Sequence, residues 1–308
     1  MAPSFGGKEA GSSSRRRSKA SRYGILEADV SSFPEDHFIK VGPWNTRYWV
    51  AGNDGPVLVL VHGLGGIAEN WHRNIAPLSA GRRVYAVDLP GFGKTDKTPL
   101  VGDIRELVDF LGAFLDALGL EKASFAGNSL GGGLILQFAA KHPGRTEKLV
   151  LVDNAGFGRE VLFDLRACSL PLIGEWFTRP SKGAATSLWD KIVYDTSVVS
   201  QELFDIGYET YCLPGASRAL IHTLRAGINL CGQRKALLKE LWSGLRTLPA
   251  PALIVWGRQD RIIPLKHAEA GLHLLPRAEV HVFDECGHMP QLEHADEFND
   301  LVRRFLDR

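Results

Sequence analysis

The stretch Ala123-Ser124-Phe125-Ala126-Gly127-Asn128-Ser129-Leu130-Gly131-Gly132-Gly133 decides the fold of this chain. The apolar residues before Gly127 predict a strand, and the run from Gly132 to Ala140 predicts a helix. Between them lies the pattern G-x-S-x-G, which in this context is typical of a sharp turn that exposes a serine as a nucleophile. A β-carbon at either flanking glycine would collide with the neighbouring strand or helix. Ser129 is therefore the candidate nucleophile.

Strand-like and helix-like segments alternate on both sides of this stretch. A hairpin is predicted over residues 38–51 with Gly42-Pro43 in its turn, and apolar steps of three and four residues predict a helix over 107–118 and a final one over 295–306. Strands separated by helices favour right-handed crossovers and a mostly parallel sheet. The further predicted strands are short apolar runs at residues 57–61, 84–87, 124–126, 149–152, 253–256 and 280–283.

The alternation stops over residues 157–246, which hold helix-like stretches, turn residues and large apolar side chains, without a clean apolar strand. We interpret this segment as a helical cap inserted into one α/β core formed by residues 36–156 and 247–308. Residues 1–35 begin with a basic segment of six Lys or Arg against one acid in the first 22 positions. We expect a poorly ordered tail there, with a transit peptide as the alternative.

Composition limits the classes of function. The 308-residue chain has a net charge of +1, and the first 22 residues carry +5, which leaves −4 for the rest. This balance argues against a nucleic-acid partner. No run of about 18 apolar residues is present, so no membrane partner is expected. The cysteines are widely spaced and form no C-x-x-C pair, which indicates reduced thiols in a cytoplasmic protein rather than disulfides or a zinc site. They are Cys168, Cys212, Cys231 and Cys286.

A nucleophilic serine needs a neighbouring base, and the base needs a third group that orients it. Asp260 and His288 each follow a predicted strand, in the chain order Ser…Asp…His. The carboxyl ends of parallel strands share one rim of the sheet, so these distant residues are expected to meet. Asp153 is the reserve acid. We predict a catalytic group of Ser129, Asp260 and His288, with neither metal nor cofactor.

A site for the negative oxygen formed by serine attack is predicted in Val61-His62-Gly63-Leu64-Gly65-Gly66, which follows the first buried strand. We expect the backbone N–H groups of Leu64 and Leu130 to be its donors. The stretch Gly91-Phe92-Gly93-Lys94-Thr95 resembles the end of a phosphate-binding loop. The glycine that such a loop requires would fall at position 88, which is Asp88, so we reject nucleotide binding.

With these residues in place, residues 36–308 resemble the α/β-hydrolase superfamily. The motifs that carry the resemblance are His62-Gly63, the stretch Asp88-Leu89-Pro90-Gly91-Phe92-Gly93, the Ser129 turn, Asp260 and His288. The resemblance implies an α/β-hydrolase fold: a mostly parallel sheet of about eight strands flanked by helices. It also implies that the helical lid at 157–246 lies between the sixth and seventh strands.

Within the superfamily, the chain resembles the meta-cleavage-product hydrolases, which split carbon–carbon bonds in ring-fission products of aromatic degradation. The likeness rests on Gly127-Asn128-Ser129, Asn70 and the stretch from Cys286 to Phe298. It implies substrate-binding positions, which are Gly63, Asn70, Asn128 and Met289.

Two positions depart from the subgroup's pattern. The subgroup usually has tryptophan after the catalytic histidine, where this chain has Met289. The subgroup also binds the substrate carboxylate with a lid arginine, and that position falls near Gly207-Tyr208 here. Arg218 and Arg225 are the candidate substitutes.

Because that carboxylate anchor is missing, we expect a serine hydrolase that cleaves carboxylic esters through an acyl-enzyme. The apolar lid predicts a small-molecule acyl substrate that is apolar and of modest size. The alternative is hydrolysis of a carbon–carbon bond in a vinylogous diketone on the same residues. An alternative of another class is a non-catalytic small-molecule receptor. A homo-oligomer is left open.

Overall fold

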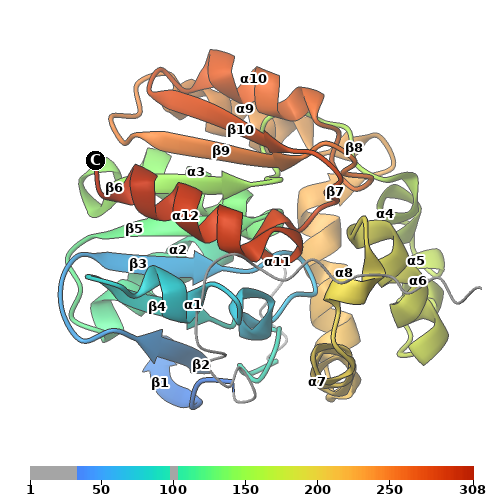
Figure 1. The fold of residues 1–308 in the computed structure, drawn as a ribbon. Helices are drawn as coiled ribbons and strands as arrows, with labels where there is room; N and C mark the ends of the chain where they lie inside the picture. Colours follow the sequence, from blue (N-terminus) through green and yellow to red (C-terminus); the bar gives the residue numbers. More distant parts are fainter. Residues whose placement is uncertain (1–32, 98–102) are drawn as a thin grey trace, which may run out of the picture. The chain divides into compact units, whose positions relative to one another are not determined.

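Eight strands form one sheet in the order β1-β2-β4-β3-β5-β6-β9-β10 (Figure 1). The computed structural model describes residues 33–97 and 103–308. All neighbouring strands are parallel except the pairs β1–β2 and β2–β4, so the predicted mostly parallel sheet is confirmed. The strands are β1 (His37–Val41), β2 (Trp44–Ala51), β3 (Val57–Val61), β4 (Arg83–Val87), β5 (Ala123–Asn128), β6 (Thr146–Val152), β9 (Ala252–Gly257) and β10 (Ala278–Phe283).

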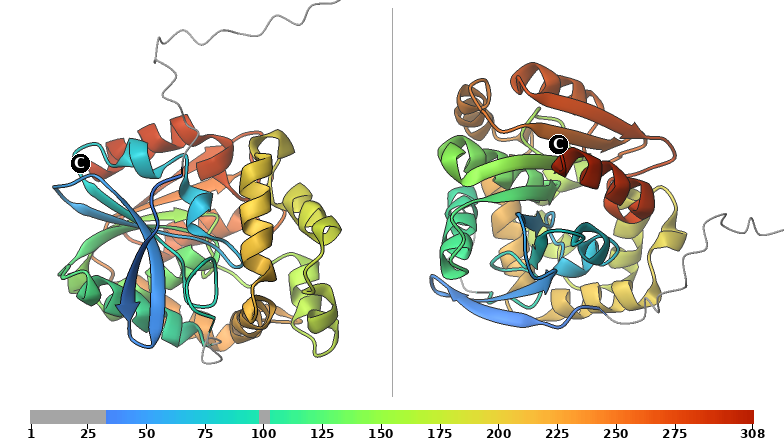
Figure 2. Two further views of the ribbon diagram at one scale, coloured as in Figure 1. Left: turned by 90° about the horizontal axis from the view of Figure 1, so that it is seen from below. Right: turned by 60° about the vertical axis from the view of Figure 1, so that its left-hand side comes forward.

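Helices cover both faces of this sheet, which explains why its central strands are continuous apolar runs. On one face, α1 (Ile75–Leu78) packs against α12 (Ala295–Leu306) (Figure 2). On the other face, α2 (Ile104–Ala117) packs against α3 (Leu130–Lys141). In α12, Phe298, Val302 and Phe305 are buried at steps of four and three residues, as expected of an amphipathic helix on a sheet.

The chain between β6 and β9, the sixth and seventh strands of the sheet, is largely helical, as predicted. It also contains a two-stranded antiparallel sheet that the sequence analysis did not predict, because strands of two residues show no alternation. Its elements are α4 (Phe163–Cys168), α5 (Ile173–Phe177), α6 (Lys182–Ile192), α7 (Gln201–Cys212), α8 (Ala216–Gly227), β7 (Ile228–Asn229), β8 (Gly232–Gln233) and α9 (Lys235–Leu245).

Short helical segments complete the fold. They are the 3-10 turns Ala68–Trp71, Pro143–Arg145 and Thr196–Val198, and the helices α10 (Lys266–Leu274) and α11 (Pro290–Glu293). The division into a core (36–156 and 247–308) and a cap (157–246) stays a prediction. The predicted tail of residues 1–35 lies almost entirely outside the described residues. In the part of the chain that the structure describes, no helix is both long and apolar enough to cross a membrane.

Candidate active site

Ser129 occupies a strained turn between β5 and α3. Its φ and ψ are 55° and −116°, outside the regions that side chains favour, which typically costs about 1–3 kcal/mol. A β-carbon on Gly127 would lie 2.6 Å from the carbonyl carbon of Gly131, and one on Gly131 would collide with the carbonyl oxygen of Val61. The predicted need for both glycines is therefore confirmed. The turn is held by a hydrogen bond from Ser129 N to Val152 O of 2.9 Å.

Asp260 and His288 form a buried hydrogen-bonded pair. His288 Nδ1 lies 2.8 Å from Asp260 Oδ2, and the two side chains are 6% and 0% exposed. The other carboxylate oxygen, Oδ1, accepts from the backbone N–H groups of Ile262 and Ile263 at 2.7 and 3.1 Å. These contacts fix the carboxylate and select the Nδ1–H tautomer of the imidazole, which leaves Nε2 free to take a proton.

The serine turn and the histidine loop are directly connected. The Asn128 amide donates to the backbone oxygen of His288 at 3.0 Å and to that of Val152 at 3.2 Å. Among the described residues, no hydrogen bond joins Ser129 to the His288 ring. Catalytic hydrogen bonds are often long in ligand-free enzymes and shorten when substrate binds. The structure therefore places Asn128, the neighbour of the nucleophile, in contact with the backbone of the base, His288.

Glu293, at the end of α11, holds the loop that carries His288, a role that the sequence analysis missed. Its carboxylate accepts from the N–H groups of Gly287 at 2.9 Å, Met289 at 3.2 Å and Tyr194 at 2.6 Å. His288 N also donates to Ile192 O at 2.6 Å. The loop that carries His288 is therefore hydrogen-bonded both to the inserted segment and to α11. The only sequence signal was an acid five residues after a candidate histidine.

Asp153, the reserve acid, lies beside the predicted acid rather than replacing it. It is fully buried with a φ of 43°, and its Oδ1 accepts from Gly257 N at 3.0 Å. Ligand atoms of Asp153, Asp260 and His288 lie within 4.8 Å of one another, a spacing that a cation could also use. Burial and the neighbouring charge of Asp260 raise the pKa of Asp153 well above its usual value. Burial thus favours the protonated form of Asp153.

The loop after β3 approaches the nucleophile closely. A β-carbon on Gly63 would lie 3.0 Å from the β-carbon of Ser129. In the described ranges, the N–H groups of Leu64 and Leu130 donate to no backbone or side-chain acceptor, and their role as oxyanion donors stays a prediction. His62 has its Nδ1 2.8 Å from Gly63 O and accepts from Leu89 N at 3.0 Å. Burial lowers the pKa of His62 to about 4, so its ring is neutral and structural.

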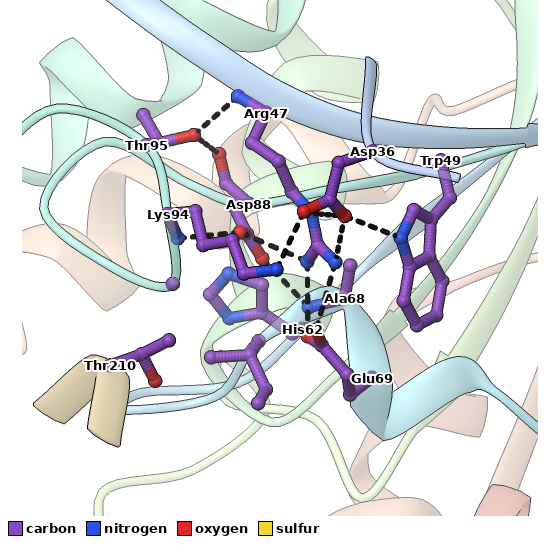
Figure 3. A network of polar contacts seen from close by, with 12 residues as sticks. Asp36, Arg47, Trp49, His62, Ala68, Glu69, Asp88, Lys94, Thr95 and Thr210 are labelled. Atoms are coloured by element: carbon purple, nitrogen blue, oxygen red, sulfur yellow. Dashed lines mark hydrogen bonds and ion pairs between the residues drawn. The ribbon is translucent and has the colours of Figure 1, made fainter. Parts of the chain in front are cut away.

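A buried ionic network supports this loop (Figure 3). The Arg47 guanidinium donates to Glu69 at 2.8 and 3.0 Å and to Asp88 at 3.2 Å. Asp88 Oδ1 accepts from Ala68 N at 2.7 Å, and its Oδ2 accepts from Lys94 N at 2.8 Å. The stretch that resembles a phosphate-binding loop thus wraps around the Asp88 carboxylate and anchors the segment after β3.

A largely apolar cavity of about 90 Å³ opens beside Ser129. Its lining residues come from the serine turn, the loop after β3, the inserted segment and the Asp260 loop. They include Leu64, Ser129, Leu130, Val161, Leu165, Thr223, Leu224, Gln233, Arg234, Leu238, Leu241, Ile262 and Ile263.

The predicted substrate-binding residues do not line this cavity. Gly63 touches the serine turn, Asn128 bonds to the His288 loop, and the Asn70 side chain accepts from Ile67 N at 2.8 Å. Met289 is buried beside Leu292. Their roles in binding substrate stay predictions.

The two candidate arginines are also absent from the cavity lining, which contains Arg234 instead. Arg225 is engaged elsewhere, since its guanidinium pairs with Glu175 at 2.6 and 2.8 Å.

Comparison with known proteins agrees with this fold. Residues 58–301 match the model of the alpha/beta hydrolase family, and the chain belongs to that family. A 2-hydroxy-6-oxononadienedioate/2-hydroxy-6-oxononatrienedioate hydrolase from Pseudomonas sp. is 35% identical over 296 residues, which cover 92% of this chain and 99% of that protein. The dihydrolipoyllysine-residue acetyltransferase component of the acetoin cleaving system of Pseudomonas putida is 34% identical over 280 residues, which cover 91% and 71%.

A solved structure agrees as well. The meta-cleavage product hydrolase from Pseudomonas fluorescens IP01, in complex with acetates, superposes with a TM-score of 0.75 at 32% identity, covering 88% of this chain and 97% of that one. The resemblance to meta-cleavage-product hydrolases is therefore confirmed, and the protein is a hydrolase of the α/β-hydrolase fold.

Proposed function

We propose that the protein hydrolyses a carbon–carbon bond in a meta-cleavage product, a vinylogous diketone, through Ser129, His288 and Asp260. The observation that carries the proposal is the 2.8 Å bond between His288 Nδ1 and Asp260 beside the Ser129 turn. The relatives named above favour this reaction over the ester hydrolysis that we expected first.

The first half-reaction forms an acyl-enzyme. Ser129 Oγ attacks the ketone carbon while its proton moves to Nε2 of His288, and Asp260 stabilises the resulting imidazolium. The carbon–carbon bond then breaks, and its electron pair moves through the conjugated enone to the distant carbonyl oxygen, which gives the dienolate that leaves. His288 returns the proton to the leaving fragment, and the acyl group stays on Ser129.

Water completes the reaction. His288 takes a proton from water, the hydroxide attacks the acyl carbon, and Ser129 leaves with the proton held by His288. One water is consumed and a carboxylic acid is released. In both halves, the N–H groups of Leu64 and Leu130 would donate to the negative oxygen, and loss of one such donor typically costs about 10²–10³ in turnover. The mechanism calls for no metal and no cofactor.

Ester hydrolysis is the second candidate, and two sequence positions favour it. The tryptophan that usually follows the catalytic histidine is Met289, and the position of the carboxylate-binding arginine falls near Gly207-Tyr208. The same three residues would cleave an ester, because an alkoxide leaves as readily as a stabilised carbanion.

The decisive test compares a 2-hydroxy-6-oxo-2,4-dienoate with p-nitrophenyl esters of short fatty acids. We expect kcat/KM to be at least about 10²-fold higher for the dienoate, and Ser129→Ala to lower kcat by about 10⁴-fold or more. A clear preference for the esters would replace the proposal with the second candidate. A protein that cleaves neither and forms no adduct with a fluorophosphonate would be the predicted receptor.

A cytoplasmic location remains our proposal as well. All four cysteines, which lie in the described part of the chain, are free thiols. Free thiols are the usual state in reducing compartments.

A further inference from the structure

Two polar side chains of the inserted segment line the cavity beside Ser129, where most neighbours are apolar. Thr223 lies on α8 and is 2% exposed, and Gln233 lies on β8 and is 7% exposed. Neither residue belongs to the catalytic group. Buried polar atoms normally have hydrogen-bond partners, so any that lack one call for an explanation.

The orientation of the Gln233 amide is fixed by the backbone. Its Oε1 accepts from Gly156 N at 2.9 Å, and a donor at that position excludes the flipped amide. The backbone N of Gln233 also donates to Arg159 O at 2.8 Å, which holds the strand in place. Within the described ranges, Nε2 is buried and has no hydrogen-bond partner. A rigid N–H donor without a partner therefore belongs to a residue that lines the cavity.

The Thr223 hydroxyl is likewise without a partner among the described residues. Helical threonines commonly donate to the carbonyl four residues earlier, as Thr210 does to Ile206 O at 3.0 Å. Thr223 makes no such bond. Its helix faces the site, since Leu224 and Gly227 line the cavity with it. Thr223 is thus a second cavity-lining residue whose buried polar atom has no partner among the described residues.

The cavity lies on the acyl side of the proposed reaction. Ser129 and the predicted oxyanion donors line it, whereas His288 does not. Because His288 must give its proton to the leaving fragment, that fragment lies on the histidine side. The acyl part of the substrate then fills the cavity.

The charges of the lining favour a neutral ligand group. Arg234 is the one charged residue in the described lining, and it is exposed, with its Nε donating to Arg225 O at 2.8 Å. A carboxylate placed against Thr223 and Gln233 would lose its hydration without a buried cation in compensation.

We propose that Gln233 and Thr223 recognise a neutral hydrogen-bonding group, a ketone or hydroxyl oxygen, on an otherwise apolar acyl chain. This inference rests on the proposed function, since it assigns the specificity of the same site. Gln233 donates through Nε2, and Thr223 donates or accepts through Oγ1.

The test uses p-nitrophenyl esters of matched length: hexanoyl, 5-oxohexanoyl, 5-hydroxyhexanoyl and an acyl chain that ends in a carboxylate. We expect kcat/KM for 5-oxohexanoyl to exceed that for hexanoyl by about tenfold. Thr223→Val should reduce that ratio severalfold, and thermal unfolding of the variant is the control for folding. Thr186→Val, on the exposed face of α6, is the matched control and should leave the ratio unchanged.

Gln233→Glu makes the test more specific. The glutamate keeps an oxygen that accepts from Gly156 N, but an oxygen acceptor replaces the Nε2 donor. We expect it to disfavour the ketone but retain the hydroxyl ester, which can donate. Equal ratios in wild type, Thr223→Val and Gln233→Glu would overturn the proposal. So would a preference for the carboxylate-ended chain, which would indicate recognition by Arg234.

A binding experiment separates this proposal from the proposed reaction. Calorimetry with the Ser129→Ala variant should show heptane-2,6-dione binding about tenfold more tightly than heptan-2-one. If the variant shows this difference in affinity but the wild-type protein cleaves none of the substrates, the proposed reaction would be overturned and the recognition site supported. Equal affinities would overturn the recognition site, whatever the enzyme cleaves.

Discussion

Two buried carboxylate clusters follow parallel strands of the same sheet, and they are neutralised in different ways. In the first cluster, Asp88 follows β4 and faces the guanidinium of Arg47 at 3.2 Å. In the second cluster, Asp153 follows β6 and lies beside Asp260, whose partner is the imidazole of His288. The first cluster contains a permanent cation, and the second contains only groups that gain or lose a proton.

This difference indicates a structural role for the first cluster and a catalytic role for the second. The carboxylates around Arg47 raise the pKa of that guanidinium still further, so it never releases a proton. An arginine network can therefore fix a loop but cannot take part in acid–base catalysis. In the second cluster, burial favours the protonated form of Asp153, and no described residue hydrogen-bonds to Nε2 of His288. Proton transfer during the reaction is therefore expected in the second cluster.

Among substitutions in the two clusters, the largest effect is expected from Asp260→Asn. The amide keeps an acceptor for Ile262 N and Ile263 N, but it removes the charge that orients and stabilises the His288 imidazolium. We expect kcat to fall by about 10³–10⁴-fold with little change in thermal stability. Steady-state kinetics and thermal unfolding measure the two quantities. A loss below about tenfold would remove Asp260 from the mechanism.

Arg47→Met tests the structural cluster. It leaves Glu69 and Asp88 buried without their cation, so the free energy of unfolding should fall by about 3–5 kcal/mol. Turnover per folded molecule, counted by fluorophosphonate titration, should stay within a few fold. Arg105→Met removes an exposed ion pair with Glu240 and serves as the matched control, with no measurable change expected. A loss of turnover in Arg47→Met without a loss of stability would contradict the purely structural role of the first cluster.

Asp153→Asn tests the proton in the second cluster through pH. The folded-state pKa of Asp153 is raised above the unfolded value of about 3.9, so wild type loses stability as pH rises from there toward the folded pKa. The amide has no such titration and keeps an acceptor for Gly257 N. The advantage of the variant should grow by up to about 1.4 kcal/mol per pH unit in urea unfolding as pH rises above about 4. A pH-independent difference would mean that Asp153 is ionised.

Thr95→Val is expected to have the smallest effect. The Thr95 hydroxyl accepts from Arg47 N at 2.9 Å and donates to Asp88 O at 2.9 Å, both buried. Its loss should lower the free energy of unfolding by about 1–2 kcal/mol, measured by chemical denaturation, and leave kcat unchanged. A change in kcat with unchanged stability would connect the first cluster to the chemistry.

The parts of this protein that follow from local pattern could be predicted from its sequence. The Ser129 turn, the strands and the Asp260–His288 pair each depend on a short stretch with its own glycine or apolar run. Long-range contacts of residues that carry no motif of their own could not be predicted. Glu293 meets Tyr194 across 99 positions, and Gln233 meets Gly156 across 77.

The relatives favour the alternative reaction over the ester hydrolysis that we expected first from the sequence. The missing arginine near Gly207 directed the prediction to esters, because a linear alignment assumes that one position holds the anchor. The relatives favour carbon–carbon hydrolysis despite the change at that position.

The most direct test of the account is the rate of covalent labelling by a fluorophosphonate, followed by intact mass and peptide mapping. We expect one adduct per chain, on Ser129, and a rate reduced by about 10³-fold or more in His288→Ala, because the hydroxyl loses its base. An adduct on another residue, or an unchanged rate in His288→Ala, would contradict the claim that this histidine activates this serine.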